Sequence, residues 1–406
     1  MDQVPAFGPK GLTRVPFHVY QDPAVLEREQ QRLFEGPVWN YLCLEADILD
    51  AGDWRTTFVG RMPVVVVRTE SGDIAAFENR CLHRGSLICL DNAGNARDFT
   101  CVYHSWRYDL SGNLKSIAFR RGVNGKGGMP DSFRPEDFST RKLRVTTIGG
   151  IVFGTFSQVA PSIEDFVGSE VAAALRVTTS RPLQVIGRFT EVLPNNWKLY
   201  AENVRDTYHA SLLHVFFATF RINRLSQGGG VSVSANGACH VSTTLAPTQE
   251  TDTAYDGMRS VDDGLQLSDP SMLDAVDEHG DRVRQQILSV FPSFAMQRTY
   301  NVMAIRQFVP RGIDRTDLHW IYLGYADDPP ALRRRRLKQL NLAGPAGFVS
   351  MEDGCIGNFV ERGAAAAGHG VSLLEMGGGG FESQETRVTE TAIRGFWKMW
   401  REIMKP

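Results

Sequence analysis

Two short stretches decide how this chain folds: Cys81-Leu82-His83 and, after seventeen intervening residues, Cys101-Val102-Tyr103-His104. Each pairs one thiol with one imidazole, as C-x-H and then C-x-x-H. Two thiolates and two neutral imidazoles can hold a [2Fe–2S] cluster in which histidines replace two of the cysteines on one iron. Such a cluster has a reduction potential of roughly −150 to +300 mV, against about −400 mV for an all-cysteine plant-type cluster. The pattern therefore predicts an electron-transfer site.

A structural zinc site is the alternative for the same four residues, since two cysteines and two histidines also suit tetrahedral zinc. Zinc modules usually begin with C-x-x-C pairs, whereas each stretch here joins one cysteine to one histidine in a β-rich, turn-rich region. We therefore prefer the iron–sulfur cluster. Cys89 lies between the two stretches and is expected to be structural.

The composition is that of an ordinary globular protein. The 406 residues exceed the length at which one hydrophobic core usually stops growing, so two domains are expected. Hydrophobic residues make up 42% and charged residues 22%, which excludes disordered, collagen-like and disulfide-dense classes. The formal net charge of −2 gives no reason to expect a nucleic acid as partner.

No apolar run approaches the roughly 20 residues that a membrane span needs. The first residues show no basic stretch followed by an apolar one, so no secretory signal is visible and a cytoplasmic location is expected. In a reducing compartment six cysteines are not a disulfide framework, and those beside histidines become candidate metal ligands.

The pattern of strand, helix and turn signals divides the chain into three segments. We predict an N-terminal helical segment at 1–39 that packs on the catalytic domain, a β-rich cluster domain at 40–157, and a catalytic domain at 158–406. Asp22-Pro23 is typical of a helix start, with a capping carboxylate followed by proline. Ser71-Gly72-Asp73 separates two runs with strand character.

The third segment mixes α and β signals. Strands are predicted at 183–193, 302–309 and 319–325, the last two in one antiparallel sheet. Helices are predicted at 196–217 and at 383–404, the second with one apolar stripe.

A second group of candidate ligands lies in the predicted helix 196–217. His209 and His214 are five residues apart, and Asp206 precedes the first by three. On a regular α-helix, residues five apart point about 140° away from each other, which is poor for a shared metal. A local π-type widening would bring both onto nearly one face. Two buried, hydrogen-bonded core histidines remain the alternative for this segment alone.

The upstream electron-transfer site favours a metal here, because such a module needs a redox acceptor. Two histidines and one carboxylate with open positions are the ligand set of non-haem Fe(II) oxygen chemistry. A helix start is expected at Met351-Glu352-Asp353, and we choose Asp353 as the third ligand, with Glu352 as the alternative.

Together these segments resemble the large (α) subunit of Rieske non-haem iron ring-hydroxylating oxygenases, over nearly the whole chain. The resemblance is carried by the cluster residues Cys81, His83, Cys101 and His104, by the D-x-Y-H-x-x-x-x-H motif from Asp206 to His214, and by the Gly344-Pro345-Ala346-Gly347-Phe348 run that leads to Asp353. It implies an α+β fold: a β-rich Rieske [2Fe–2S] domain, then a catalytic domain with an antiparallel sheet flanked by helices, of the helix-grip, Bet v1-like type.

The resemblance also implies the cofactors and partners. A reductase passes electrons from NAD(P)H to the [2Fe–2S] cluster, and O2 reacts at a mononuclear Fe(II) held by His209, His214 and Asp353. In this family the cluster of one subunit faces the iron of the next in a head-to-tail trimer. Asp206 then bridges the two centres as a catalytic residue rather than a ligand, a helix-surface charge being the alternative. A small β subunit in an α3β3 hexamer is expected.

Several stretches most resemble the family members that act on terephthalate, among them 193–200 and 394–397. The related salicylate 5-hydroxylases share much of this framework. Terephthalate carries carboxylates at opposite ends of a flat ring, so its site should offer a cation at each end. Arginine suits this, because its planar fork grips a carboxylate with two hydrogen bonds.

Arg306, in a predicted strand, and Arg387, at the start of the predicted C-terminal helix, are the substrate-binding candidates. Arg394 lies seven residues further on the same helical face and is a rival, and each arginine could instead be structural. The expected reaction is cis-dihydroxylation of an aromatic carboxylate, terephthalate first. Hydroxylation of salicylate or another benzoate is the alternative.

A non-catalytic electron carrier with a Rieske domain is the rival from another functional class. It predicts two irons per chain, whereas an oxygenase with a cluster and a mononuclear site predicts three.

Overall fold

The structure, a computed structural model, describes residues 7, 11–248, 252–345 and 347–405. Ala346 of the 344–348 run and residues 1–6 and 8–10 of the predicted N-terminal segment lie outside the described residues. The chain forms two compact units, Phe34–Ala160 and a second made of Met1–Leu33 with Pro161–Pro406. The sequence placed these boundaries slightly differently, at 39/40 and 157/158.

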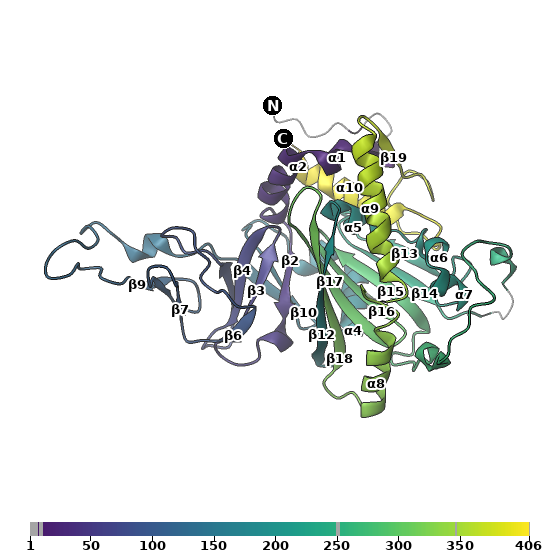
Figure 1. Ribbon diagram of the computed structural model, residues 1–406, viewed down its shortest axis with the longest axis horizontal. Helices are drawn as coiled ribbons and strands as arrows, with labels where there is room; N and C mark the ends of the chain where they lie inside the picture. Colours follow the sequence, from purple (N-terminus) through teal and green to yellow (C-terminus); the bar gives the residue numbers. More distant parts are fainter. Residues whose placement is uncertain (1–6, 8–10, 249–251, 346, 406) are drawn as a thin grey trace. The chain divides into compact units, whose positions relative to one another are not determined.

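The first unit is built from three small antiparallel sheets (Figure 1). The four-stranded sheet has the order β5-β4-β3-β6 and contains the buried valine run 64–67 in β4. The predicted strand pair around Ser71-Gly72-Asp73 is confirmed as β4 and β5. The strands are β2 (Asn40–Leu44), β3 (Asp53–Val59), β4 (Met62–Arg68), β5 (Ile74–Glu78), β6 (Ala93–Asn95), β7 (Phe99–Thr100), β8 (Arg107–Tyr108), β9 (Leu114–Ser116), β10 (Arg144–Ile148) and β11 (Ile151–Thr155).

The second unit is organised by one seven-stranded sheet in the order β12-β18-β17-β16-β15-β14-β13, with every neighbouring pair antiparallel. The three strands predicted from the sequence are confirmed in it as β12, β17 and β18. Its strands are β12 (Leu183–Leu193), β13 (Gly229–Val233), β14 (His240–Leu245), β15 (Val283–Val290), β16 (Phe294–Thr299), β17 (Val302–Pro310) and β18 (Thr316–Tyr325). Outside it, β1 (Arg14–Pro16) pairs with β19 (Val371–Leu373).

The helices of this unit complete the α+β arrangement. Tyr200 of α5 packs edge-on against Phe308 of β17, so α5 lies on the sheet. Phe396 of α10 packs against Phe291, in the turn between β15 and β16. The helices are α1 (His18–Gln21), α2 (Pro23–Arg28), α3 (Ile163–Val167), α4 (Ser169–Thr178), α5 (Trp197–Asn203), α6 (Ala210–Leu213), α7 (Val215–Thr219), α8 (Pro330–Gln339), α9 (Ser350–Ala366) and α10 (Thr391–Met404).

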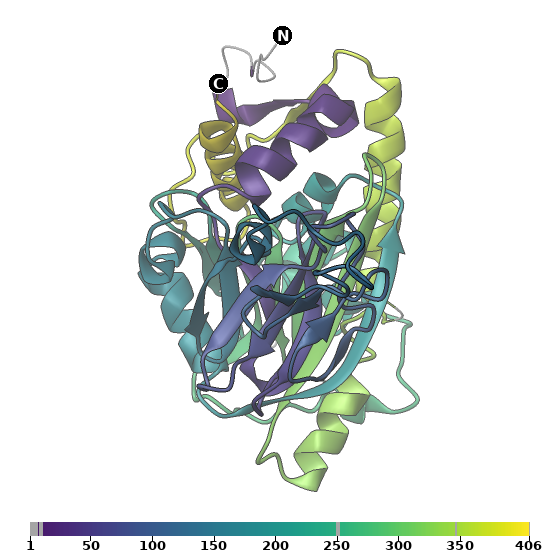
Figure 2. The same ribbon diagram turned by 90° about the vertical axis from the view of Figure 1, so that its left-hand side faces the viewer.

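A buried polar network ties the N-terminal helices to α5 and α10. Figure 2 shows the N-terminal helices, in purple, beside α10, in yellow. The Glu29 carboxylate accepts from the indole N–H groups of Trp197 at 2.9 Å and Trp400 at 2.7 Å. It also pairs with the fully buried Lys198 ammonium at 2.9 Å. Buried charges are tolerated when they are paired and hydrogen-bonded in this way, so the network holds α5 in a fixed place. The Asp22 cap on α2 is confirmed: its carboxylate accepts from the Ala24 amide at 2.8 Å.

The prediction of one helix over 196–217 is wrong. The chain forms α5, a non-helical stretch, and then the short helices α6 and α7. Asp206 Oδ1 accepts from the main-chain N–H of Tyr208 at 2.8 Å and of His209 at 3.2 Å. An aspartate that bonds the backbone just ahead of it offers an alternative to helical hydrogen bonds, and it ends α5 here.

The C-terminal helix is also shorter than predicted. It begins at Thr391, so residues 383–390, Arg387 among them, form irregular chain. Side-chain hydroxyls of this segment bond nearby amides, as in Thr389 Oγ1 accepting from Thr391 N at 3.1 Å. Such local bonds compete with helix formation at threonine and serine.

Among the described residues, the structure contains no helix with the length and apolar character required to cross a membrane.

Candidate active site

The four predicted cluster ligands lie on two loops with matching backbone hydrogen bonds. Cys81 N donates to Ser86 O at 2.8 Å and Gly85 N to Cys81 O at 2.9 Å. In the second loop Cys101 N donates to Trp106 O at 2.9 Å and Ser105 N to Cys101 O at 3.0 Å. Gly85 and Ser105 occupy equivalent positions with φ of 78° and 55°. Each loop thus closes on its own cysteine, and the left-handed residue allows that tight turn.

The structure brings the donor atoms of these two loops together. His83 Nδ1 lies 3.1 Å from His104 Nδ1, and the two rings are 4.5 Å apart. Both cysteines are buried and both histidines are exposed. A pair of buried sulfurs with a pair of convergent Nδ1 atoms fits the ligand set of a cluster with one sulfur-ligated and one imidazole-ligated iron.

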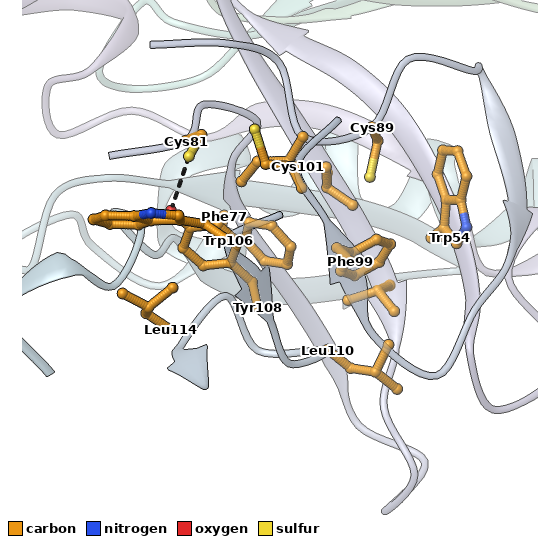
Figure 3. Packing of buried hydrophobic residues seen from close by; sticks show 13 residues of the cluster. Trp54, Phe77, Cys81, Cys89, Phe99, Cys101, Trp106, Tyr108, Leu110 and Leu114 are labelled. Atoms are coloured by element: carbon orange, nitrogen blue, oxygen red, sulfur yellow. Dashed lines mark hydrogen bonds between the residues drawn. The ribbon is translucent and has the colours of Figure 1, made fainter. Parts of the chain in front are cut away.

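The surroundings of the loops suit such a cluster. The Tyr108 hydroxyl donates to Cys81 Sγ at 3.3 Å, drawn as a dashed line in Figure 3. Burial raises the pKa of the Cys81 thiol, although this hydrogen bond favours the thiolate. Desolvation and the neighbouring His104 and Arg84 lower the pKa of His83, so the imidazole is neutral, as a metal ligand must be. Trp106 stacks on the His83 ring at 4.9 Å and covers it on one side.

The predicted iron ligands also meet. One donor atom from each of His209, His214 and Asp353 lies within 4.8 Å of the other two. Asp353 Oδ1 is 3.4 Å from His209 Nε2 and 3.3 Å from His214 Nε2. The two histidines lie just outside the two ends of the short helix α6, and His214 has an extended backbone, so the ligands meet without the π-type widening that the sequence suggested. Two imidazoles and one carboxylate fit a non-haem Fe(II) site.

The electrostatics of these three residues suit a cation. Burial would raise the pKa of Asp353, but the two histidines hold it well below its usual range. Burial would likewise lower the pKa of His209, yet Asp206 and Asp353 raise it to about 10. A divalent metal would displace the protons that the histidines carry in its place.

Asp206, the predicted bridge, lies behind His209. Its Oδ2 is 3.2 Å from His209 Nδ1, on the side of the ring away from Asp353. Its side chain is about a quarter exposed, so one flank remains accessible to another molecule.

Glu352, the alternative third ligand in the sequence analysis, lies behind the other histidine, a place that the sequence did not predict. Glu352 Oε2 accepts from His214 Nδ1 at 2.6 Å, which leaves Nε2 directed at Asp353. Glu352 thus lies outside the group formed by His209, His214 and Asp353, and its carboxylate orients the His214 ring. Asn203 Nδ2 donates to Asp353 Oδ1 at 3.0 Å and orients the third ligand in the same way. The sequence offered one indication of this role, namely that two acidic residues, Glu352 and Asp353, stand next to each other at a helix start.

Arg387 lines a small cavity beside this centre, about 20 Å³ in volume. The cavity is bounded by Asp206 and Thr207 on one side and by sheet residues such as Ser242 and Ile287 on the other. The Arg387 guanidinium donates to Asn223 Oδ1 and to main-chain carbonyls of the 224–227 turn. Burial lowers its pKa to about 10, and no carboxylate in the described part of the chain forms an ion pair with it.

Arg306 is buried on the same sheet. Its Nη1 donates to the Tyr200 hydroxyl at 3.1 Å, and its guanidinium lies 5.1 Å from the Trp320 ring centre. Its Nε and Nη2 have no hydrogen-bond partner among the described residues. A buried cation with unused donors is costly unless an anion completes it.

Arg394, the rival of Arg387, has a different place. It donates to the main-chain carbonyls of Leu374 and Met376, both at 3.0 Å, and to Gly380 O. It therefore secures the 374–380 loop rather than lining the cavity.

Comparisons with known proteins agree with this geometry. Residues 38–125 match the Rieske [2Fe-2S] domain, and residues 180–406 match the ring hydroxylating alpha subunit (catalytic domain). The chain is 53% identical over 394 residues to the terephthalate 1,2-dioxygenase terminal oxygenase component subunit alpha 2 of a Comamonas species, covering 97% of this chain and 95% of the relative. It is 42% identical to the anthranilate 1,2-dioxygenase large subunit of Burkholderia cepacia, covering 97% and 93%.

The fold is also that of a solved oxygenase. Naphthalene 1,2-dioxygenase from a Rhodococcus species superposes with a TM-score of 0.79 at 22% identity, covering 96% of this chain and 94% of that one. The predicted α+β fold is thereby confirmed. The two domain matches and the His209–His214–Asp353 group identify the cofactors as a Rieske [2Fe–2S] cluster and a mononuclear iron.

Proposed function

Because the chain belongs to the α subunits of ring-hydroxylating dioxygenases, we propose that it is the large subunit of a terminal oxygenase that cis-dihydroxylates an aromatic carboxylate, terephthalate in particular. O2 and electrons from NAD(P)H, delivered by a reductase, complete the reaction.

Two buried arginines that lack carboxylate partners carry the choice of substrate. Arg387 lies beside Thr244 and Gln285, which pair across β14 and β15. Arg306 lies on β17, in a row of directly paired residues that runs across the strands and begins at His240 of β14. His240 precedes Thr244 by four residues on β14. At about 3.4 Å per residue the two rows are about 14 Å apart along the strand. The inward-reaching guanidinium groups can then hold the two ends of one flat dicarboxylate.

The residues between the arginines suit an aromatic ring. Ile287 gives an apolar floor, and Ser242, its cross-strand partner, adds a small side chain. An apolar pocket with a few fixed polar groups is the usual form of a small-molecule site. With both carboxylates fixed, the ring can neither rotate nor slide, so one edge is held toward the metal ligands.

We assign Cys81, His83, Cys101 and His104 to the cluster and His209, His214 and Asp353 to the iron. When bound, the cluster supplies electrons and the mononuclear iron supplies activation of O2. Asp206 connects the two centres through the partly exposed flank of its carboxylate. That role requires a neighbouring subunit, in keeping with a trimer of α subunits with or without small β subunits.

The charge at Arg387 gives the sharpest test of the substrate. Removing one partner of a buried ion pair costs roughly 2–5 kcal/mol. Arg387→Ala should therefore lower kcat/KM for terephthalate steeply while benzoate, with one carboxylate, loses far less. Arg387→Lys is the matched control, since it keeps the charge without the fork. Equal losses on both substrates would contradict the two-ended pocket.

Other aromatic acids serve as competitors in the same assay. Turnover of salicylate or anthranilate with terephthalate untouched would leave the metal assignments standing but remove the proposed roles of both arginines.

A further inference from the structure

His240, on the first position of β14, is a buried histidine with one nitrogen unused. Its Nδ1 lies 2.7 Å from Ser289 Oγ, whereas its Nε2 has no hydrogen-bond partner anywhere in the described residues. The side chain is only 1% exposed. An unsatisfied buried polar atom is uncommon in native proteins and calls for a partner that the chain itself does not provide.

The sheet places His240 in line with Arg306. His240 pairs with Ser289, Ser289 with Ala295, and Ala295 with Arg306, so all four side chains point to the same face. Three strand spacings of about 4.8 Å separate the outer two backbones, about 14 Å in all. The two residues between them, Ser289 and Ala295, have small side chains and are fully buried.

Unused polar atoms lie at both ends of this row, on the same face of the sheet. Arg306 offers Nε and Nη2, and His240 offers Nε2. Burial and the nearby Arg205 and Arg306 cations hold the pKa of His240 well below its ordinary value, so the ring is neutral. In the tautomer whose Nδ1 accepts from the Ser289 hydroxyl, Nε2 carries the proton and can donate it to a carboxylate oxygen.

We propose that His240 is a substrate-binding residue that donates a hydrogen bond from Nε2 to the same aromatic carboxylate that Arg306 holds. In this arrangement the Ser289 hydroxyl donates to Nδ1. The inference rests on the proposed function and deepens it, because it gives one end of the pocket a neutral donor beside its cation. This end of the pocket favours an ionised carboxylate over an uncharged ester or amide, because the Arg306 cation binds a negatively charged acceptor more strongly than a neutral one.

The test is anaerobic calorimetric titration of the holoenzyme with terephthalate, benzoate and salicylate. His240→Leu should weaken terephthalate binding about 10-fold to 100-fold, the range for a hydrogen bond to a charged group. His240→Gln, whose amide can donate from a similar place, should stay within about threefold of wild type. The visible spectrum of the cluster and the melting temperature report whether each variant is folded.

A double-mutant cycle with Arg306→Gln separates a shared ligand from two independent effects. Because both residues bind one carboxylate, the double variant should lose less than the sum of the single losses. If His240→Leu does not give folded holoenzyme, His240→Asn replaces it, since its shorter amide does not reach and should again bind about tenfold more weakly than His240→Gln.

Three outcomes would overturn the proposal. Terephthalate binding by His240→Leu within about twofold of wild type would do so, as would equal losses in His240→Leu and His240→Gln, which indicate packing alone. A wild-type enzyme that binds none of the three acids would contradict the proposed function as well. The first two results, with normal wild-type binding, contradict only the role of His240.

Discussion

The two metal centres of this chain are built in opposite ways. The proposed cluster ligands lie on two loops, each closed by hydrogen bonds to its own cysteine. The proposed iron ligands come from the stretch after α5 and from α9, and the Asn203–Asp353 contact joins residues 150 positions apart. The first centre is therefore encoded locally, whereas the second exists only when the helices pack on the sheet.

This difference predicts that the two centres can be removed separately. Cys101→Ser removes one of two sulfurs in a self-contained loop and should abolish the cluster while leaving the mononuclear iron. Asp353→Asn should abolish the mononuclear iron and turnover while leaving the visible spectrum of the cluster. Iron analysis should fall from about three per chain to about one and about two, respectively. Loss of both centres in either variant would show that they do not form independently.

A smaller effect is expected where a carboxylate supports a ligand. Glu352→Gln keeps the size of the side chain but removes the charge beside His214 Nδ1. Such substitutions usually cost about 10-fold to 100-fold in metal affinity, so Fe(II) titration of the metal-depleted protein should show weaker binding. Met351→Ala is the matched control, because Met351 is 59% exposed. Unchanged affinity in Glu352→Gln would rule out the orienting role.

The unfolding free energy of the protein should also depend on pH, through Glu202 of α5. Burial raises the pKa of Glu202 to about 7, with Asp206 adding to the effect, while hydrogen bonds from Tyr20 and Trp397 oppose it. The folded state thus keeps a proton that the unfolded chain releases near pH 4.5. This contribution to stability is full below pH 4.5 and is lost as the pH rises to 7.

Glu202→Gln removes that loss. The unfolding free energy of the wild type minus that of the variant should fall by up to about 3 kcal/mol between pH 4.5 and 7, at 1.36 kcal/mol per pKa unit. Denaturant unfolding at a series of pH values measures the difference. If the unfolding free energies of the two proteins changed with pH in the same way, the raised pKa of Glu202 would be contradicted.

The smallest effect is expected at the cluster. Tyr108→Phe removes the hydroxyl that donates to Cys81 Sγ. A hydrogen bond to sulfur stabilises the reduced cluster, so its loss should lower the reduction potential by about 20–60 mV, equivalent to about 0.5–1.5 kcal/mol. Tyr103→Phe is the control, since that hydroxyl contacts Arg84 instead. An equal shift in both variants would exclude a specific role for Tyr108.

The local character of the cluster site explains why the sequence predicted it. Two short motifs contained every donor atom, and the turns followed from residues such as Gly85. The iron site was predicted less directly: the spacing of His209 and His214 suggested a distorted helix, while the structure ends the helix with the Asp206 side chain. Where the helix ends depends on competition between side-chain and helical hydrogen bonds, which the periodicity of apolar residues does not reveal.

The pocket was the least predictable part. Arg306 was read correctly as a strand residue, but Arg387 was expected on a helix and lies in irregular chain. No ligand-like residue lies near His240 in the sequence, so the sequence indicates no binding role for it. Its relation to Arg306 comes from cross-strand register over four strands, which a sequence without an alignment does not specify.

The central claim is a pocket with a cation at each end of a flat ring. Turnover of terephthalate by the holoenzyme with NADH and a reductase, with the product mass recorded, tests it most directly. The account predicts a product heavier than terephthalate by two oxygens and two hydrogens. A salicylate product heavier by one oxygen, with terephthalate unchanged, would contradict it.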